Sequence, residues 1–105
     1  MGEKIILVFQ LMDEEYEEID IENSVTLYSL LETEKILFIV DSINAKVWIW
    51  EGKNTTTKMK FISTQLAQEI RDKYGLTFTI ASIDEDNEPE LFIKLMGLEE
   101  ELSAG

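Results

Sequence analysis

The sequence predicts a domain of the α/β class, of the α+β type, in which one sheet is covered by helices. Two observations support this prediction. Several short runs rich in β-branched and aromatic residues fill the first half of the chain, and a long amphipathic stretch at residues 56–74 follows them. A further β-like run at residues 76–83 comes next. A chain of 105 residues is long enough for one hydrophobic core without disulfides.

The first strands are predicted from alternation. Residues 4–11 alternate and are rich in β-forming side chains, which indicates a strand. Residues 16–21 alternate weakly among carboxylates, which indicates a second strand at a sheet edge, where charge discourages aggregation. Residues 24–31 fit neither pattern clearly, and we leave their structure open.

A hairpin is predicted next. Residues 35–41 are almost wholly apolar, as in a central strand that is covered on both faces. Residues 42–44 read as a tight turn, and residues 45–50 (AKVWIW) as the partner strand. Trp48 and Trp50 lie on the same face of this strand, where we expect a core aromatic pair beneath a helix.

The long helix at residues 56–74 follows three threonines that offer N-cap hydroxyls. One of its stripes is apolar or small and is predicted to face the core: Met59, Ile62, Ser63, Leu66, Ala67, Ile70 and Tyr74. Gly75 is expected to end the helix as a C′ glycine. Gly52, at the end of the preceding strand, is expected to adopt a turn with positive φ.

A second stripe of the same helix is mostly polar and faces away from the first. Its members are Phe61, Gln65, Gln68, Glu69 and Asp72. Phe61 is the exception among them, because a solvent-facing Phe has no evident role in folding. This stripe is the candidate binding face of the sequence.

Charge limits the partners. The chain has 9 basic and 22 acidic side chains and a net charge of −13. Such a surface repels phosphate backbones and anionic lipids, so we expect no nucleic-acid partner and no membrane insertion. No apolar run reaches the roughly 20 residues that cross a bilayer, and no targeting segment is evident, so a cytoplasmic location is expected.

No catalytic group is predicted, and we expect a binding protein and not an enzyme. The sequence lacks His and Cys, the commonest general base and thiol nucleophile. Asp84, Asp86 and Glu88 match the start of a calcium-binding EF-hand loop, but Pro89 and Leu95 stand where that loop needs Gly and Glu. An EF-hand is therefore excluded, and only a weak surface calcium site is left as an option.

Several segments, taken in order, resemble a gelsolin-like domain of the gelsolin, villin and severin superfamily. The strand at residues 45–50 ends in a Trp-x-Gly motif at Trp50 and Gly52, and the long helix follows. The strand at residues 76–83 leads to a Glu-Pro-x-x-Phe motif at residues 88–92 that opens a short last helix. The resemblance implies a mixed sheet of five or six strands between one long and one short helix.

The resemblance is good over residues 45–98 and extends to residue 4, since family members also begin with strands. It implies a gelsolin-like domain at residues 1–98, followed by a flexible acidic tail at residues 99–105. Family members often hold calcium between a strand and the first turn of the long helix. The resemblance places Ile36 and Met59 at those positions, where calcium needs oxygen ligands. We therefore expect no internal calcium site and no cofactor.

In family members that bind actin, the outward stripe of the long helix lies in a cleft of the actin monomer. The resemblance thus implies that Phe61, Gln65, Gln68, Glu69 and Asp72 bind actin or an actin-like protein, and that the domain caps filaments or sequesters monomers. The alternative is a non-actin structural or protein-interaction module of a larger assembly, since some gelsolin-like domains, such as those of vesicle-coat proteins, do not bind actin. The oligomeric state is left open.

Overall fold

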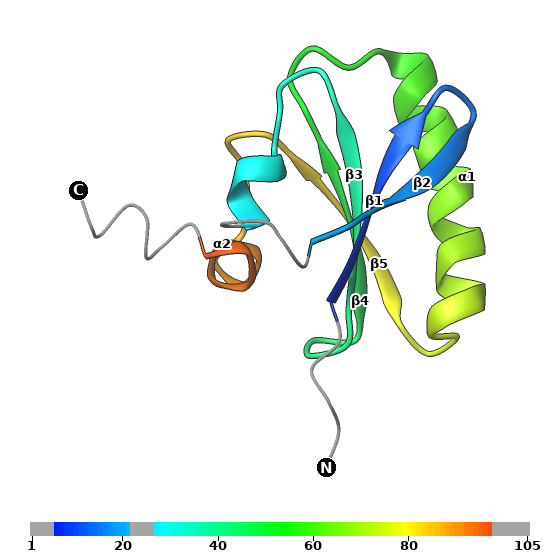
Figure 1. Ribbon diagram of the computed structural model, residues 1–105, viewed down its shortest axis with the longest axis vertical. Coiled ribbons are helices and arrows are strands. Elements are labelled where there is room, and N and C mark those ends of the chain that lie inside the picture. Colours follow the sequence, from blue (N-terminus) through cyan, green and yellow to red (C-terminus); the bar gives the residue numbers. More distant parts are fainter. Residues whose placement is uncertain (1–5, 22–26, 98–105) are drawn as a thin grey trace.

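The computed structural model describes residues 6–21 and 27–97 and contains one five-stranded sheet (Figure 1). The strands are β1 (Ile6–Met12), β2 (Glu15–Ile19), β3 (Ile36–Asp41), β4 (Lys46–Glu51) and β5 (Thr79–Asp84). Their order across the sheet is β2-β1-β3-β4-β5. Only β4 and β5 pair in parallel, and the other neighbours are antiparallel. The sheet is therefore mixed, and β2 lies at an edge, as predicted.

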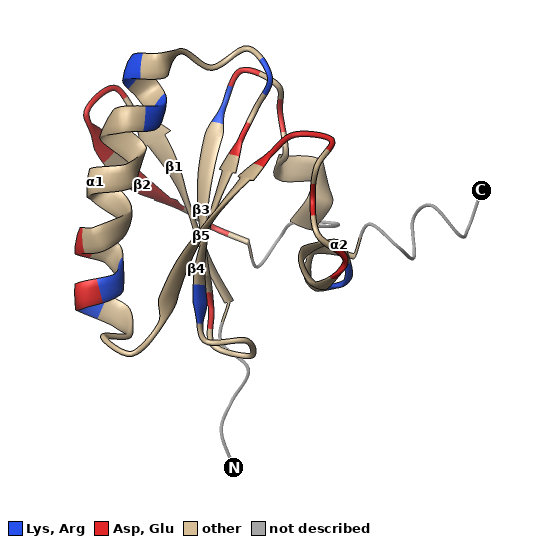
Figure 2. Ribbon diagram, turned by 180° about the vertical axis from the view of Figure 1, so that it is seen from behind, with Lys and Arg blue, Asp and Glu red and all other residues tan. Residues whose placement is uncertain are grey.

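Helices cover both faces of this sheet. The long helix α1 (Thr57–Tyr74) lies along one face, and the short helix α2 (Glu90–Met96) lies on the other (Figures 1 and 2). A single 3-10 turn, η1 (Leu27–Leu30), packs on the same side as α2. It lies within the segment 24–31 whose structure the sequence left open, and residues 24–26 of that segment lie outside the described residues. Within the described residues, no helix is long and apolar enough to cross a membrane.

The buried strand β3 divides the core into two layers. Its side chains alternate, because successive residues of a strand point to opposite faces. Ile36, Phe38 and Val40 pack with α1, whereas Leu37 and Ile39 pack with the α2 layer. All of β3 is buried, so the prediction of a central strand covered on both faces is confirmed.

The aromatic pair of β4 lies in the α2 layer. Trp48 and Trp50 are 3% and 1% exposed and pack with Phe92 and Met96 of α2. The ring centroids of Trp48 and Phe92 are 5.6 Å apart in an edge-to-face arrangement, which suits aromatic quadrupoles. The predicted core pair beneath a helix is confirmed, and the helix concerned is the short one.

The predicted turn between β3 and β4 is confirmed and is closed by a buried carboxylate. Asp41 is fully buried, and its carboxylate accepts hydrogen bonds from the backbone N–H groups of Ile43 and Asn44. It also accepts bonds from the Asn44 side chain at 2.7 Å and from Trp48 Nε1 at 2.9 Å. A buried charge is costly unless it is hydrogen-bonded, and here four donors meet that need.

Two glycines are required for a reason that the sequence did not reveal. Neither Gly52 nor Gly75 has positive φ; Gly75, for example, is extended at φ −172°. A Cβ on Gly52 would lie 2.2 Å from the carbonyl oxygen of Thr33, and one on Gly75 would lie 2.7 Å from the ring of Phe78. The predictions of a positive-φ turn at Gly52 and of a C′ glycine at Gly75 were therefore wrong in mechanism. Both glycines permit close approach of another segment, although Gly75 does end the helix.

Some boundaries differ from expectation. The strand predicted at residues 76–83 begins only at Thr79, because residues 75–78 form the turn out of α1, closed by a bond from Phe78 N–H to the Gly75 carbonyl. The predicted acidic tail at residues 99–105 and the start of the first strand lie outside the described residues.

Candidate partner-binding face

The start of α1 is fixed by Thr56, as the run of threonines predicted. Thr56 is the N-cap, and its hydroxyl accepts the backbone N–H of Met59 at 3.1 Å. The Met59 sulfur in turn lies 3.5 Å from the Thr56 backbone nitrogen. The two contacts have the reciprocal form of a capping box, so the Met59 side chain is engaged at the helix start.

The inward side of α1 supplies most of one core layer. Ser63, Leu66, Ala67 and Ile70 are buried, which confirms the predicted phase of the helix. Tyr74 departs from the prediction: it is 38% exposed, although its ring lies 5.7 Å from that of Phe9. Because Tyr74 is the last residue of the helix, it covers the edge of the core.

The outward stripe of α1 is solvent-facing. All five predicted members, Phe61, Gln65, Gln68, Glu69 and Asp72, are exposed. Phe61 is 64% exposed, so most of its side chain faces solvent and lies outside the packed core. The structure thus brings the five residues onto one helix, over about three turns, on the side remote from the sheet.

Glu69 lies toward one flank of this stripe. It lines a hollow together with Leu66 of α1 and with Glu14, Glu15 and Tyr16 of the β1–β2 hairpin. The hairpin contribution was not predicted, because the residues concerned are about 50 positions apart in the sequence. Its only sequence signal was Tyr16, an apolar side chain in an acidic run.

The charge on α1 is unusual for a helix start. Lys58 and Lys60 lie in its first turn, which has no acidic residue. The N-terminal end of a helix disfavours cations, so these lysines do not stabilise α1 through the helix dipole. Lys58 lines a hollow together with Asp13 and Glu14 of the β1–β2 hairpin, and Figure 2 shows the basic start of α1 and the acidic hairpin in blue and red.

A buried carboxylate lies at the end of β4, close enough to Lys60 of α1 for their charges to interact. Glu51, the last residue of β4, is 9% exposed and is opposite Asp84 in the parallel register of β4 and β5. Burial raises the pKa of Glu51 above its ordinary value of 4.5, and a hydrogen bond with Asp84 raises it further. The positive charge of Lys60 acts in the opposite direction. Lys60 therefore partly offsets the cost of a buried anion.

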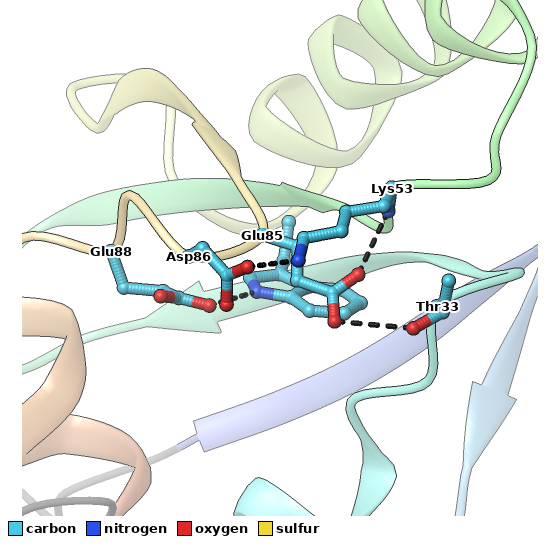
Figure 3. Close-up of polar contacts among 6 residues, drawn as sticks. Thr33, Lys53, Glu85, Asp86 and Glu88 are labelled. Carbon is cyan, nitrogen blue, oxygen red and sulfur yellow. Dashed lines mark hydrogen bonds and ion pairs between the residues drawn. The ribbon is translucent and has the colours of Figure 1, made fainter.

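The acidic loop after β5 is bonded to the rest of the fold (Figure 3). Glu85 accepts hydrogen bonds from the Thr33 hydroxyl at 3.1 Å and from the Lys53 backbone N–H at 2.8 Å. Asp86 pairs with Lys53, and Glu88 accepts from Trp50 Nε1 at 2.9 Å. The hydrogen bond and charge of Asp86 raise the pKa of Lys53 above 10.5.

This arrangement separates the carboxylates that resembled a calcium loop. Asp84, Asp86 and Glu88 bond to Glu51, Lys53 and Trp50 respectively. Among the described residues, no group of three or more acidic side chains is gathered as a metal site would need. Ile36 is fully buried in β3 and Met59 is engaged at the cap of α1. The absence of an internal calcium site stays a prediction.

Comparison with known proteins places the fold. No protein-family model matches the sequence, and no curated protein matches it. Among solved structures, the chain is similar to Thorarchaeota ProGel in its complex with rabbit actin, with a TM-score of 0.74 and 22% identity. That match covers 88% of this chain and 99% of the other.

A second similar structure is Thorarchaeota 2DGel3, also in complex with rabbit actin. Its TM-score is 0.63 at 22% identity, and the match covers 85% of this chain. The matched part is 44% of the 2DGel3 chain, so this chain spans less than half of that protein's length. At this level of identity the likeness concerns the fold, and it confirms the predicted gelsolin-like architecture of a mixed sheet between a long and a short helix.

Proposed function

We propose that this protein is a gelsolin-like binding module, not an enzyme, and that it binds actin or an actin-like protein through the outward stripe of α1. The observation that carries the proposal is the exposure of Phe61, at 64%, on the polar side of a long helix. A large exposed ring framed by polar side chains is typical of an interface anchor. The fold is shared with two proteins that were crystallised with actin.

The stripe has the form that helix-in-groove recognition needs. An amphipathic helix binds a groove through residues spaced by three and four positions. Phe61, Gln65, Gln68 and Asp72 have that spacing and are all exposed. Phe61 would be the apolar anchor, and the amides and carboxylate would form a polar rim.

Charge favours the same face. The protein has a net charge of −13, so an acidic partner is repelled by most of its surface. Lys58, Lys60, Arg71 and Lys73 all lie on α1, which makes this helix the least repulsive approach. Lys60 also interacts with the buried Glu51, whereas Lys58, which the helix dipole disfavours, would be accounted for by a role in binding.

The mechanism we propose is steric. A helix seated in a cleft of one subunit occupies space that a neighbouring subunit needs, so a single domain caps a filament end or sequesters a monomer. Severing needs a second domain that holds the filament side, and we do not propose it. We also propose that binding needs no calcium in the domain, since Ile36 and Met59 offer no oxygen side-chain ligand.

Co-sedimentation and polymerisation kinetics with purified actin test this function, each with and without calcium. Capping predicts slower elongation at substoichiometric protein, whereas sequestration predicts a loss of filament in proportion to the protein added. In both cases calcium should not alter the protein's own affinity. Unchanged polymerisation together with no complex would contradict the proposal.

A second candidate is a non-actin interaction module of a larger assembly. The match covers 44% of the 2DGel3 chain, so the same fold occurs as part of a longer protein, although that longer protein is itself in complex with actin. An exposed Phe61 fits this reading equally well. A Phe61-dependent complex with a protein other than actin, and none with actin, would support it.

A further inference from the structure

A groove runs between α1 and the β1–β2 hairpin, beside the outward stripe. It consists of two adjoining hollows, of about 250 Å³ and about 450 Å³. The first is lined by Leu11, Asp13, Glu14, Lys58, Met59 and Ile62. The second is lined by Glu14, Glu15, Tyr16, Leu66 and Glu69. Glu14 lines both hollows, so they lie next to each other along α1.

The surface of the first hollow is mainly apolar, whereas that of the second hollow is mainly polar. Leu11, Tyr16, Met59 and Ile62 are half-buried and pack against the core cluster below α1, to which Leu66 belongs. The core therefore reaches the surface here. Apolar surface that faces water is stabilised when a partner covers it, so these side chains offer a binding energy that the fold does not use.

The rim of the groove is acidic. Asp13, Glu14, Glu15 and Glu69 face one cation, Lys58. Within residues 6–21 and 27–97, the first three carboxylates form no hydrogen bond or ion pair and are exposed. Glu18 lies on the same face of the edge strand β2 as Tyr16 and adds to this acidic series. The electrostatic potential at the groove is therefore negative, because the one lysine there does not neutralise the carboxylates.

This combination identifies the chemistry of an occupant. A second copy of the chain is a poor occupant, because its net charge of −13 is repelled by the acidic rim. The segment 98–105 of the same chain is a poor occupant for the same reason, since it is itself acidic. Half-buried apolar side chains with a carboxylate rim complement one or two apolar side chains flanked by Lys or Arg. We propose that the groove is a second docking surface and that it takes a basic, apolar-centred segment of a partner protein.

This surface is separate from the one proposed for actin. Phe61, Gln65, Gln68 and Asp72 do not line the groove, and only Glu69 belongs to both sets. The groove proposal therefore stands whether or not α1 binds actin. If both hold, the two surfaces lie side by side and allow a basic segment and the helix-binding partner to be held on the same side of the sheet.

The test is an NMR titration of the whole chain with the peptide acetyl-Lys-Arg-Leu-Leu-Arg-Lys-amide at physiological salt, where long-range attraction is largely screened. We expect saturable shifts of backbone amides at residues 11–16 and 58–69. A peptide with Ser in place of Leu keeps the charge, and one with Asp and Glu in place of the cations keeps the apolar centre. Each should bind at least about tenfold more weakly.

Protein variants provide the matched control. Glu14→Lys with Glu15→Lys reverses two exposed rim charges outside the outward stripe and should weaken the peptide at least about tenfold. Glu90→Lys changes an exposed charge on α2, on the opposite side of the sheet, and should alter affinity by less than about twofold at this salt. Thermal unfolding of each variant establishes that the fold is retained.

Three outcomes would overturn the proposal. The first is no shift at about 1 mM peptide, a concentration at which even weak docking is visible. The second is equal binding of the Ser peptide, which would show attraction to net charge alone. The third is a set of shifts centred on α2 or the acidic loop, or equal loss of affinity in the Glu90→Lys control.

Discussion

The inner and outer sides of α1 differ in whether packing within the fold explains their residues. On the inner side, Leu66, Ala67 and Ile70 are 8%, 0% and 0% exposed and pack on the sheet. On the outer side, Phe61 is 64% exposed and contributes little to that packing. Burial accounts for the inner residues without any reference to function. The outer side is therefore where a partner has to be sought, and the comparison separates substitutions that affect folding from those that affect binding.

A similar difference separates the two acidic segments. In the loop after β5, Glu85, Asp86 and Glu88 bond to Thr33, Lys53 and Trp50 and hold distant segments together. In the β1–β2 hairpin, Glu14 and Glu15 are exposed at the rim of a groove. The carboxylates of the loop after β5 thus form bonds within the fold, whereas those of the β1–β2 hairpin give the surface of the groove a negative charge.

The largest expected effect lies on the inner side of α1. Leu66→Ala or Ile70→Ala should lower the free energy of unfolding by about 2–5 kcal/mol, because each leaves a cavity in a packed layer. Trp50→Ala should cost a similar amount or more. Urea unfolding checks this, with Gln65→Ala as the control, expected within about 0.5 kcal/mol of wild type. Near-neutral values for all three core variants would show the assigned burial to be wrong.

The next effect lies on the outer side. Phe61→Ala should weaken partner binding by about 1–3 kcal/mol, mostly through the off-rate. Its free energy of unfolding should stay within about 0.5 kcal/mol of wild type, because the ring is exposed. Surface plasmon resonance and urea unfolding measure the two quantities. If Phe61→Ala lowered the free energy of unfolding and left binding intact, Phe61 would have a structural role, and the proposed contrast between the two sides of α1 would be wrong.

The acidic loop provides a smaller effect that tests the same distinction among carboxylates. Glu88→Ala leaves the N–H of the buried Trp50 ring without its protein acceptor and should cost about 1 kcal/mol of stability. Glu88→Gln keeps an acceptor oxygen and should cost less. Glu14→Ala in the hairpin should be neutral within about 0.5 kcal/mol. Equal losses for Glu88→Ala and Glu14→Ala in chemical unfolding would count against the contrast.

The smallest effect concerns the pH dependence of stability at the buried Glu51 carboxylate of β4. Burial and Asp84 raise the pKa of Glu51 above 4.5, so protonation favours the folded state. The stabilisation from this group is complete below about pH 4.5 and is lost as pH rises through the folded-state pKa. Glu51→Gln should remove this dependence and be slightly more stable than wild type at pH 7.

The measurement is the difference in unfolding free energy between the Glu51→Gln variant and wild type, taken from pH 4 to pH 8. It should grow in favour of the variant as pH rises. A difference that is constant with pH, or one that favours wild type increasingly at high pH, would contradict a raised pKa. Asp84→Asn is a useful companion, since it removes the second carboxylate of the pair.

Local patterns predicted the framework well. The apolar run of β3 and the three- and four-residue spacing in α1 specify burial within one element, and both were confirmed. The exposure of Phe61 followed from the same spacing. Thr56 was recoverable as a cap because the N-cap bond to Met59 is local.

What could not be predicted depends on segments that meet only in the fold. Gly52 was assigned to a turn, but its real constraint is the Thr33 carbonyl, which lies against it from a loop 19 positions earlier (52 − 33). The bond from Trp50 to Glu88 spans 38 positions, and the groove joins Tyr16 to Leu66. Spacing within one element carries no information on such contacts.

Site-specific alkylation tests the central claim, that the outer side of α1 is the partner surface, most directly. The chain has no cysteine, so Gln65→Cys on α1 and Leu91→Cys on α2 each create one reactive thiol. Leu91 is 44% exposed and lies across the sheet. Mass spectrometry follows iodoacetamide modification of each variant with and without saturating actin. We predict that actin slows modification at position 65 at least about tenfold and leaves position 91 unchanged. Protection at position 91 alone, or a stable complex that protects neither thiol, would contradict it.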